Sequence, residues 1–131
     1  MGAHQYHSPD SVPAPPSRHA QAVESASGLR WLHISGQIGL DAKGALALSD
    51  IDQHRQIWTN IGHLLTAANM TYADLVKVTA YVTNRDQIAH YRNVRDATLN
   101  GVEVASTLVI VAALAKPEWV VEIDAVAAAS P

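Results

Sequence analysis

The sequence of 131 residues contains no cysteine and no phenylalanine, and it has few charged residues. The lack of cysteine excludes disulfide bonds, thiolate catalysis and cysteine-ligated zinc, and it fits a reducing compartment. Nine Lys and Arg residues are scattered among twelve Asp and Glu residues, which gives a formal charge of −3. We therefore expect no nucleic-acid partner, because the sequence has neither a basic patch nor phenylalanine side chains on which bases would stack.

An apolar run long enough to cross a bilayer is also missing. Lys116, Pro117 and Glu118 interrupt the longest apolar stretch, which leaves it shorter than the 18 to 20 residues of a membrane span. The N-terminus does not show the basic and then apolar pattern of a signal peptide. These absences predict a soluble, cytoplasmic protein without a membrane partner.

The seven histidines do not form a zinc motif. None has His-x-x-x-His spacing or an acidic partner at motif distance, so we predict no metal site and no cofactor. One tripeptide needs separate mention: after removal of Met1, the sequence Gly2-Ala3-His4 would offer a square-planar donor set that suits Cu(II) or Ni(II). A flexible tail that binds metal only in the test tube is the simpler interpretation.

The composition, with 48% hydrophobic and 16% charged residues, predicts one globular domain. Residues 1–17 are polar and hold four of the six prolines, so we expect a flexible lead-in there. The domain itself is predicted to cover residues 18–131.

Hydrophobic periodicity predicts five strands and two helices within this domain. The first two strands are expected to form a hairpin around Ala26-Ser27-Gly28. Helical stripes follow Ser49 and Asn84, each of which is predicted to cap a helix, with Asn69 in a left-handed conformation after the first one. The order β-β-α-β-α-β-β favours an α/β fold of the α+β type, with one sheet that carries two helices. The predicted strands cover residues 20–25, 29–36, 75–83, 106–114 and 119–128.

Two carboxylates lie in the middle of the last predicted strand. Because strand residues alternate between two faces, Glu122, Asp124 and Val126 share one face. That face either meets water, with the carboxylates solvated or paired, or it lines a site. On the second helix, three arginines at positions 85, 92 and 95 are interpreted as a solvated face.

Five segments of the chain follow one another in a recognisable order and spacing: "QAV" at 21–23, "ISGQI" at 34–38, "QHRQIWTNIGHLLTAAN" at 53–69, "DLVKVTAYVTN" at 74–84 and "VEIDAVA" at 121–127. Together they resemble the Rid/YjgF family of reactive-intermediate imine and enamine deaminases. The resemblance covers residues 19–128. It implies a YjgF/chorismate-mutase-like fold, a single mixed six-stranded sheet with two helices on one face.

The resemblance also implies a homotrimer with small-molecule clefts between neighbouring subunits. Self-association agrees with the residues themselves, because strands 75–83 and 106–114 are apolar on both faces. By similarity to the family, Glu122 would position the water that attacks a C=N bond. Ser35 and Gly36 would offer a hydroxyl and a backbone N–H to the ligand.

The sequence departs from the deaminase pattern at two positions. Ser106 stands where the deaminases carry an arginine that grips the substrate carboxylate, and His19 stands where they carry a tyrosine. The expected substrate is therefore not the standard 2-iminobutanoate, and the hydroxyls of Ser106 and Thr107 would face a neutral or cationic ligand. Alternatively, Arg18 supplies the missing charge from a new direction.

Three functions remain open at this point. The first is hydrolytic deamination of a small imine or enamine. The second is a trimer that holds a small metabolite in the same clefts without turnover. The third is a ribonuclease or translation-inhibitor role, which the acidic charge balance and the missing basic patch disfavour.

Overall fold

The computed structural model describes residues 3–131 and contains six strands and two α-helices. Along the chain the elements are β1 (His4–His7), β2 (Ala22–Ser25), β3 (Arg30–Gln37), α1 (Asp50–Ala67), a 3-10 turn (Tyr72–Asp74), β4 (Leu75–Val82), α2 (Gln87–Leu99), β5 (Ala105–Ile110) and β6 (Val121–Ala129). The α+β fold class predicted from the sequence, with two helices on a mixed sheet, is confirmed. The six strands form a four-stranded and a two-stranded sheet and not the single six-stranded sheet that was expected.

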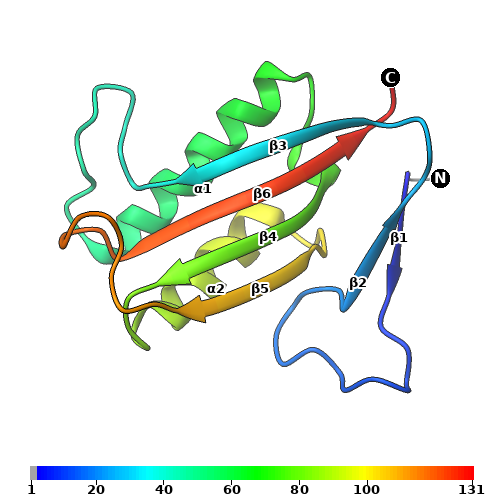
Figure 1. Cartoon of the computed structure of the whole chain (residues 1–131), viewed down its shortest axis with the longest axis horizontal. Helices are drawn as coiled ribbons and strands as arrows, with labels where there is room; N and C mark the ends of the chain where they lie inside the picture. Colours follow the sequence, from blue (N-terminus) through cyan, green and yellow to red (C-terminus); the bar gives the residue numbers. More distant parts are fainter. Residues whose placement is uncertain (1–2) are drawn as a thin grey trace.

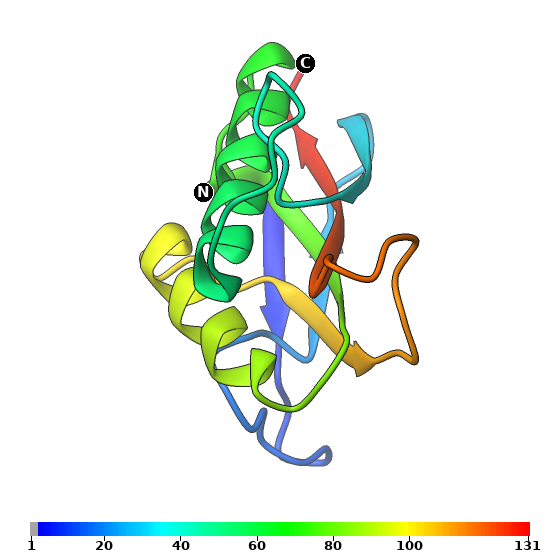
Figure 2. The same cartoon turned by 90° about the vertical axis from the view of Figure 1, so that its left-hand side faces the viewer.

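The main sheet has the strand order β3-β6-β4-β5, so β3 and β5 form its edges. β4 and β5 run parallel, while β6 is antiparallel to both of its neighbours. Both helices cover the same face of this mixed sheet, as Figures 1 and 2 show. The opposite face, called the outer face below, carries no helix.

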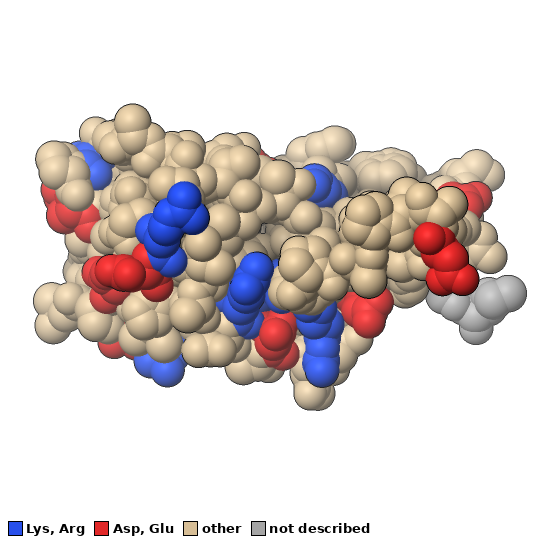
Figure 3. Space-filling model, turned by 90° about the horizontal axis from the view of Figure 1, so that it is seen from below, with Lys and Arg blue, Asp and Glu red and all other residues tan. Residues whose placement is uncertain are grey.

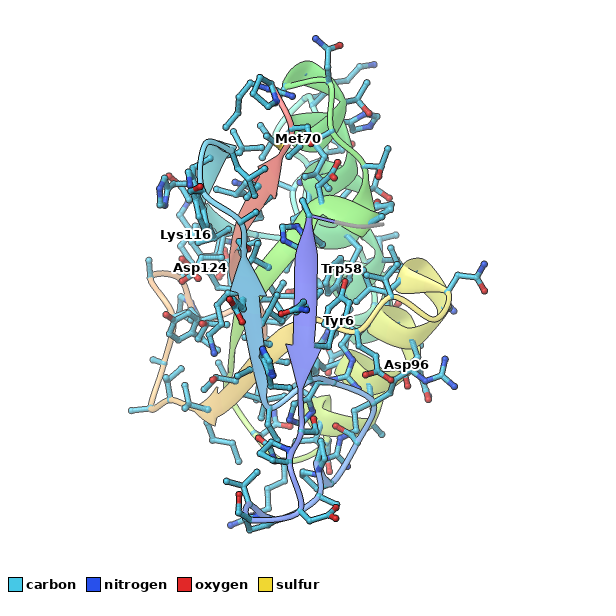
Figure 4. All side chains as sticks on the ribbon, turned by 90° about the vertical axis from the view of Figure 1, so that its right-hand side faces the viewer. Tyr6, Trp58, Met70, Asp96, Lys116 and Asp124 are labelled. Atoms are coloured by element: carbon cyan, nitrogen blue, oxygen red, sulfur yellow. The ribbon has the colours of Figure 1, made fainter. Side chains whose placement is uncertain are left out.

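The core fills the space between the helices and the sheet. Alternate residues of β4 and β6, such as Val78 and Ile123, are fully buried beneath the helices, as expected for strands with one core-facing side. From α1, Trp58 and Ile61 pack onto them. Figure 4 shows Trp58 on the helix side of the sheet and Asp124 on the other side.

The predicted ends of the first helix are confirmed, but those of the second are not. The Ser49 side chain accepts a hydrogen bond from the Asp52 backbone at 3.2 Å, and Asn69 has a φ of 57°. The second helix begins later than predicted, with Asp86 at the capping position and no side-chain cap. Asn84 instead accepts a hydrogen bond from the Asp86 backbone at 3.0 Å, as in an Asx turn.

The N-terminal region differs from the sequence prediction. β2 pairs with β1 in an antiparallel ribbon and not with β3, so the predicted hairpin at residues 26–28 is wrong. The segment that was expected to be a flexible lead-in thus contributes a strand, β1, and His4 links this strand to its neighbours by hydrogen bonds. Its ring nitrogens lie 2.8 Å from Ser25 Oγ and 3.0 Å from the Ala128 carbonyl. The tripeptide considered for copper begins at Gly2, outside the described residues.

After the ribbon's first strand, the chain passes along the free edge of β5. The backbone N–H of Ala20 donates to the Val104 carbonyl at 2.9 Å, and Ala20 forms a parallel bridge with Ala105. β5 itself ends at Ile110, four residues before the predicted end. No helix within residues 3–131 is both long and apolar enough to cross a membrane.

Candidate functional site

A β-bulge in β3 shapes the first part of the site. Ile34 pairs with Ala125, and the next paired residue, Gln37, lies opposite Ile123. Ser35 and Gly36 therefore both lie opposite a single residue of β6. A bulge of this kind bends the strand and re-aims its side chains, and bulges are common next to active sites.

Glu122 lies against this bulge. A Cβ atom built at Gly36 would overlap the Glu122 carboxylate, with 2.8 Å to its Cδ and 3.1 Å to its Cγ. Glycine at position 36 therefore allows the carboxylate to rest directly on the β3 backbone. Glu122 is half-buried, next to Tyr81 of β4 on the outer face.

The second carboxylate of β6 has a different surrounding. Tyr81 donates a hydrogen bond from its hydroxyl to Asp124 Oδ2 at 3.0 Å. This hydrogen bond, followed by the negative charge of Asp124, raises the pKa of Tyr81. Asp124 is thus engaged with Tyr81 across the strands, which leaves Glu122 as the carboxylate next to the bulge.

Two open cavities border the bulge on the β3 side of the molecule. One, of about 620 Å³, includes Gly36, Asn60 and His63 in its lining. The other, of about 380 Å³, includes Ser35 and Leu64. Both cavities are also lined by α1 and so lie toward the helix side, and neither lining includes Glu122, whose side chain points to the outer face.

A separate cavity of about 340 Å³ lies at the opposite edge of the sheet, between residues 16–21, α2 and β5. Ser106 faces the helices here, because it pairs with the buried Val78 and its Oγ lies 3.0 Å from the Tyr91 hydroxyl. His19 also lines this cavity, which is called the β5 cavity below.

Positive charge dominates the β5 cavity. Arg92 and Arg95 line it from α2. The pKa of His19 is lowered, chiefly by burial and then by the charges of Arg95, Lys77 and Arg92, with a smaller opposite effect of Glu103. His19 is consequently neutral at pH 7 and can both donate and accept a hydrogen bond.

The structure brings the predicted site residues together in two groups. Glu122, Ser35 and Gly36 form the first group at the bulge, and the second group lies in the β5 cavity. Glu122 points to the outer face, whereas Ser106 points to the helix face, and the edges that hold the two groups are three strand spacings, roughly 14 Å, apart. The second group consists of His19, Ser106 and Thr107.

Two expectations about arginines need correction. Arg18 is exposed and is not among the described residues that line the β5 cavity. Arg95, interpreted as part of a solvated face, is only 2% exposed. Its spacing could have shown this, because Arg95 follows Tyr91 by four residues and Ile88 by seven, which places all three on one helix face.

No three His, Asp or Glu side chains among residues 3–131 lie close enough together to hold a metal ion. At the bulge the described residues offer the Glu122 carboxylate, the Ser35 hydroxyl and backbone N–H groups. Such a set can bind and polarise a small polar molecule and can accept a proton from water.

Comparison with known proteins identifies similar sequences across most of the chain. The family model described as Endoribonuclease L-PSP matches residues 10–129. A RutC family protein from Pyrococcus horikoshii is 32% identical over 120 residues, which cover 90% of this chain and 92% of that protein. A protein named 2-iminobutanoate/2-iminopropanoate deaminase from Capra hircus is 33% identical and covers 78% of this chain, with 75% of its own length matched.

Solved structures agree with these sequence matches. The Rid-family protein YyfB from Yersinia pestis superimposes with a TM-score of 0.86 at 33% identity, covering 95% of this chain and 98% of that one. RidA from an Antarctic Psychrobacter has a TM-score of 0.71 at 31% identity, covering 94% of this chain and 98% of that one.

Proposed function

The chain belongs to the Endoribonuclease L-PSP family, which includes the Rid proteins, and from this premise we propose that it hydrolyses small imines or enamines. The observation that carries the proposal is the Glu122 carboxylate resting on Gly36 in the bulge, beside Ser35. Relatives named 2-iminobutanoate/2-iminopropanoate deaminase, with 30–33% identity, support the same chemistry.

The reaction requires water at carbon and protons at nitrogen. Glu122 takes a proton from water as the water oxygen bonds to the C=N carbon, and it gives this proton to the nitrogen to form a carbinolamine. Glu122 then carries the hydroxyl proton of the carbinolamine to the nitrogen as the C–N bond breaks, and the products are a carbonyl compound and ammonia. A half-buried carboxylate can serve both as base and, once protonated, as acid, while the Ser35 hydroxyl and the Gly36 N–H hold the substrate.

We place the complete site between two subunits. Within one chain, the Glu122 side chain and the β5 cavity lie on opposite faces of the sheet and toward opposite edges, so one small substrate cannot reach both. A second copy that brings its β5 edge to the first copy's β3 edge would unite them. The outer face supports such an assembly, because Trp31 and Val109 on it are 51% and 40% exposed. We propose a homotrimer with three equivalent clefts.

The direct test is turnover of imines generated in situ by an amino-acid or amine oxidase, with semicarbazide added to trap imine that has not been hydrolysed. Wild-type protein should lower the yield of trapped imine, and Glu122→Gln should lower this activity about 10²- to 10⁴-fold, since the amide keeps the shape but accepts no proton. Asp124→Asn is the matched control on the same strand, because its partner is Tyr81, and it should retain activity within a few fold.

Two results would contradict the proposal. If the panel of imines is bound but not turned over, the chain is a metabolite-binding protein that uses the same surface. If Glu122→Gln is fully active, the carboxylate is a solvated strand residue.

The ribonuclease activity in the family's name receives less support from the surface. On the face shown in Figure 3, Lys and Arg side chains lie beside Asp and Glu side chains and do not form a broad basic area. A nucleic-acid backbone requires clustered positive charge. Incubation with single-stranded RNA, alongside the imine assay, should yield no cleavage that depends on Glu122.

A further inference from the structure

We infer that Arg95 of α2 holds the carboxylate of the substrate, so that the β5 cavity selects α-imino acids. This inference rests on the proposed function for the reacting C=N group, but the anion site itself can be measured without turnover. It also revises the expectation that the substrate lacks a carboxylate. That expectation followed chiefly from the absence of an arginine at position 106, and the structure places a different arginine, Arg95, in the same cavity.

Arg95 is a buried cation with unused hydrogen-bonding capacity. Its side chain is 2% exposed, and Nε donates to Asp96 Oδ1 at 3.0 Å. Nη2 is buried and has no hydrogen-bond partner among the described residues. Burial of a donor without a partner on a charged group is costly. An anionic ligand would offset this cost by accepting a hydrogen bond from Arg95 Nη2.

The surroundings of Arg95 favour an anion over a cation. Among the described residues that line the β5 cavity, none is Asp or Glu, whereas Arg92 adds a second positive charge from the neighbouring position of the helix surface. Asp96 is 41% exposed and accepts only from Nε. Figure 4 shows Asp96 on α2. His19 stays neutral and adds no charge that changes near pH 7.

The relation of Arg95 to Ser106 explains the small side chain on the strand. Tyr91 hydrogen-bonds to Ser106 at 3.0 Å, and the Arg95 guanidinium carbon lies 5.3 Å from the centre of the Tyr91 ring. An arginine at position 106 would compete with Arg95 for this space and would repel it. The structure therefore indicates that Arg95 of α2 supplies positive charge to the cavity. The small side chain of Ser106 leaves space for the ligand.

A guanidinium presents several N–H donors in a fixed fork that matches a carboxylate, and it keeps its charge at physiological pH. The cavity, about 340 Å³, is at the small end of the range for ligand sites. It suits a short acid such as a 2-imino or 2-oxo acid of three to five carbons. The carboxylate would anchor in the β5 cavity of one subunit, and the C=N carbon would lie near Glu122 of the next.

The test is binding of 2-oxobutanoate, a stable acid of this size, measured by calorimetry on the full chain. Arg95→Gln should weaken binding about ten- to hundredfold, the loss expected for hydrogen bonds to a charged group. Arg85→Gln, an exposed arginine of the same region, is the matched control and should bind as wild type does. Adding Ser106→Arg to Arg95→Gln should restore binding, because the charge returns to the cavity from the strand.

Three results would overturn the inference. The first is unchanged binding by folded Arg95→Gln. The second is loss of binding in Arg18→Gln, which would assign the charge to the exposed arginine. The third is tighter binding of inorganic phosphate than of 2-oxobutanoate, which would mean that the cavity serves a different anion. Folding of each variant is checked by circular dichroism and by a Tm close to that of the wild-type protein.

Failure of the inference and failure of the proposed function give different patterns. If imines are hydrolysed in a Glu122-dependent way but acids have no Arg95-dependent advantage, only the carboxylate site is wrong. If 2-oxobutanoate binds through Arg95 but no imine is turned over, the site stands and the deaminase proposal does not.

Discussion

Replacement of Gly36 by alanine tests the contact on which the proposed site depends. The new Cβ would lie 2.8 Å from Glu122 Cδ and 3.1 Å from Cγ, whereas carbon atoms pack best at about 3.5 to 4.0 Å. The carboxylate must therefore move by about 1 Å or rotate away from the bulge. A displacement of this size at a reacting group can lower the rate about 10²-fold.

We expect Gly36→Ala to lower kcat/KM for imine hydrolysis about 10²-fold. The cost in unfolding free energy should be smaller, about 1 kcal/mol, because the Glu122 side chain is half-buried and can rotate. That change corresponds to a drop in Tm of about 4 °C for a chain of this length. Activity would be followed by trapping of residual imine, and Tm by circular dichroism.

A double-mutant cycle separates the overlap from other effects of the methyl group. In a Glu122→Ala background the space is free, so Gly36→Ala should no longer change Tm. Full activity of the single variant would refute the reasoning, since it would show that the carboxylate need not rest on the bulge. An equal loss of Tm in both backgrounds would mean that the alanine strains the β3 backbone and not Glu122.

Three further results are expected. Light scattering at micromolar concentration should give three times the 14.0 kDa chain mass, and a monomer would exclude a shared cleft. 2-Oxobutanoate at 100 times its Kd should stabilise the wild-type protein by about 2.7 kcal/mol and raise Tm, with a much smaller rise in Arg95→Gln. Burial lowers the pKa of His54, so its stabilising effect should be complete above about pH 6.5 and lost as pH falls below that value. In His54→Gln, the fall in Tm between pH 7 and 5 should be shallower, and an unchanged slope would contradict this.

The elements that could be predicted from sequence are those with a strong period. In β4, Val78, Ala80 and Val82 lie on the core side and are fully buried. The other face of β4 carries polar side chains, so the expectation that this strand is apolar on both faces was wrong. α1 combines an apolar stripe with a serine cap, and both were correctly located. Such patterns are local, because a few neighbouring residues determine them.

The pairing of the N-terminal ribbon was not predictable in this way. β1 consists of polar residues between His4 and His7 without alternation of hydrophobicity. Its position depends on contacts distant in sequence, such as the one between His4 and the Ala128 carbonyl. The sequence favoured β3 as the partner of β2, because β3 is the next predicted strand along the chain. In the structure β2 pairs with β1 instead, and contacts between residues distant in sequence determine this pairing.

At the candidate site, residue types were informative and their placement was not. Glu122 stood out as a carboxylate among apolar strand residues, but only the register of β3 against β6 brings it to Gly36. Arg95 was assigned to the surface because charged residues are seldom buried without a partner. Exceptions to that rule tend to occur at functional positions, where local preference and function conflict.

The fit of Glu122 over Gly36 also has a consequence for how these two positions can evolve. Any side chain at position 36 removes the volume that the carboxylate occupies, so a substitution at position 36 is penalised as long as position 122 holds glutamate. In a deep alignment of related chains, we expect glycine at the first position wherever glutamate holds the second. Lineages that lose the glutamate should be free to acquire larger residues in the bulge.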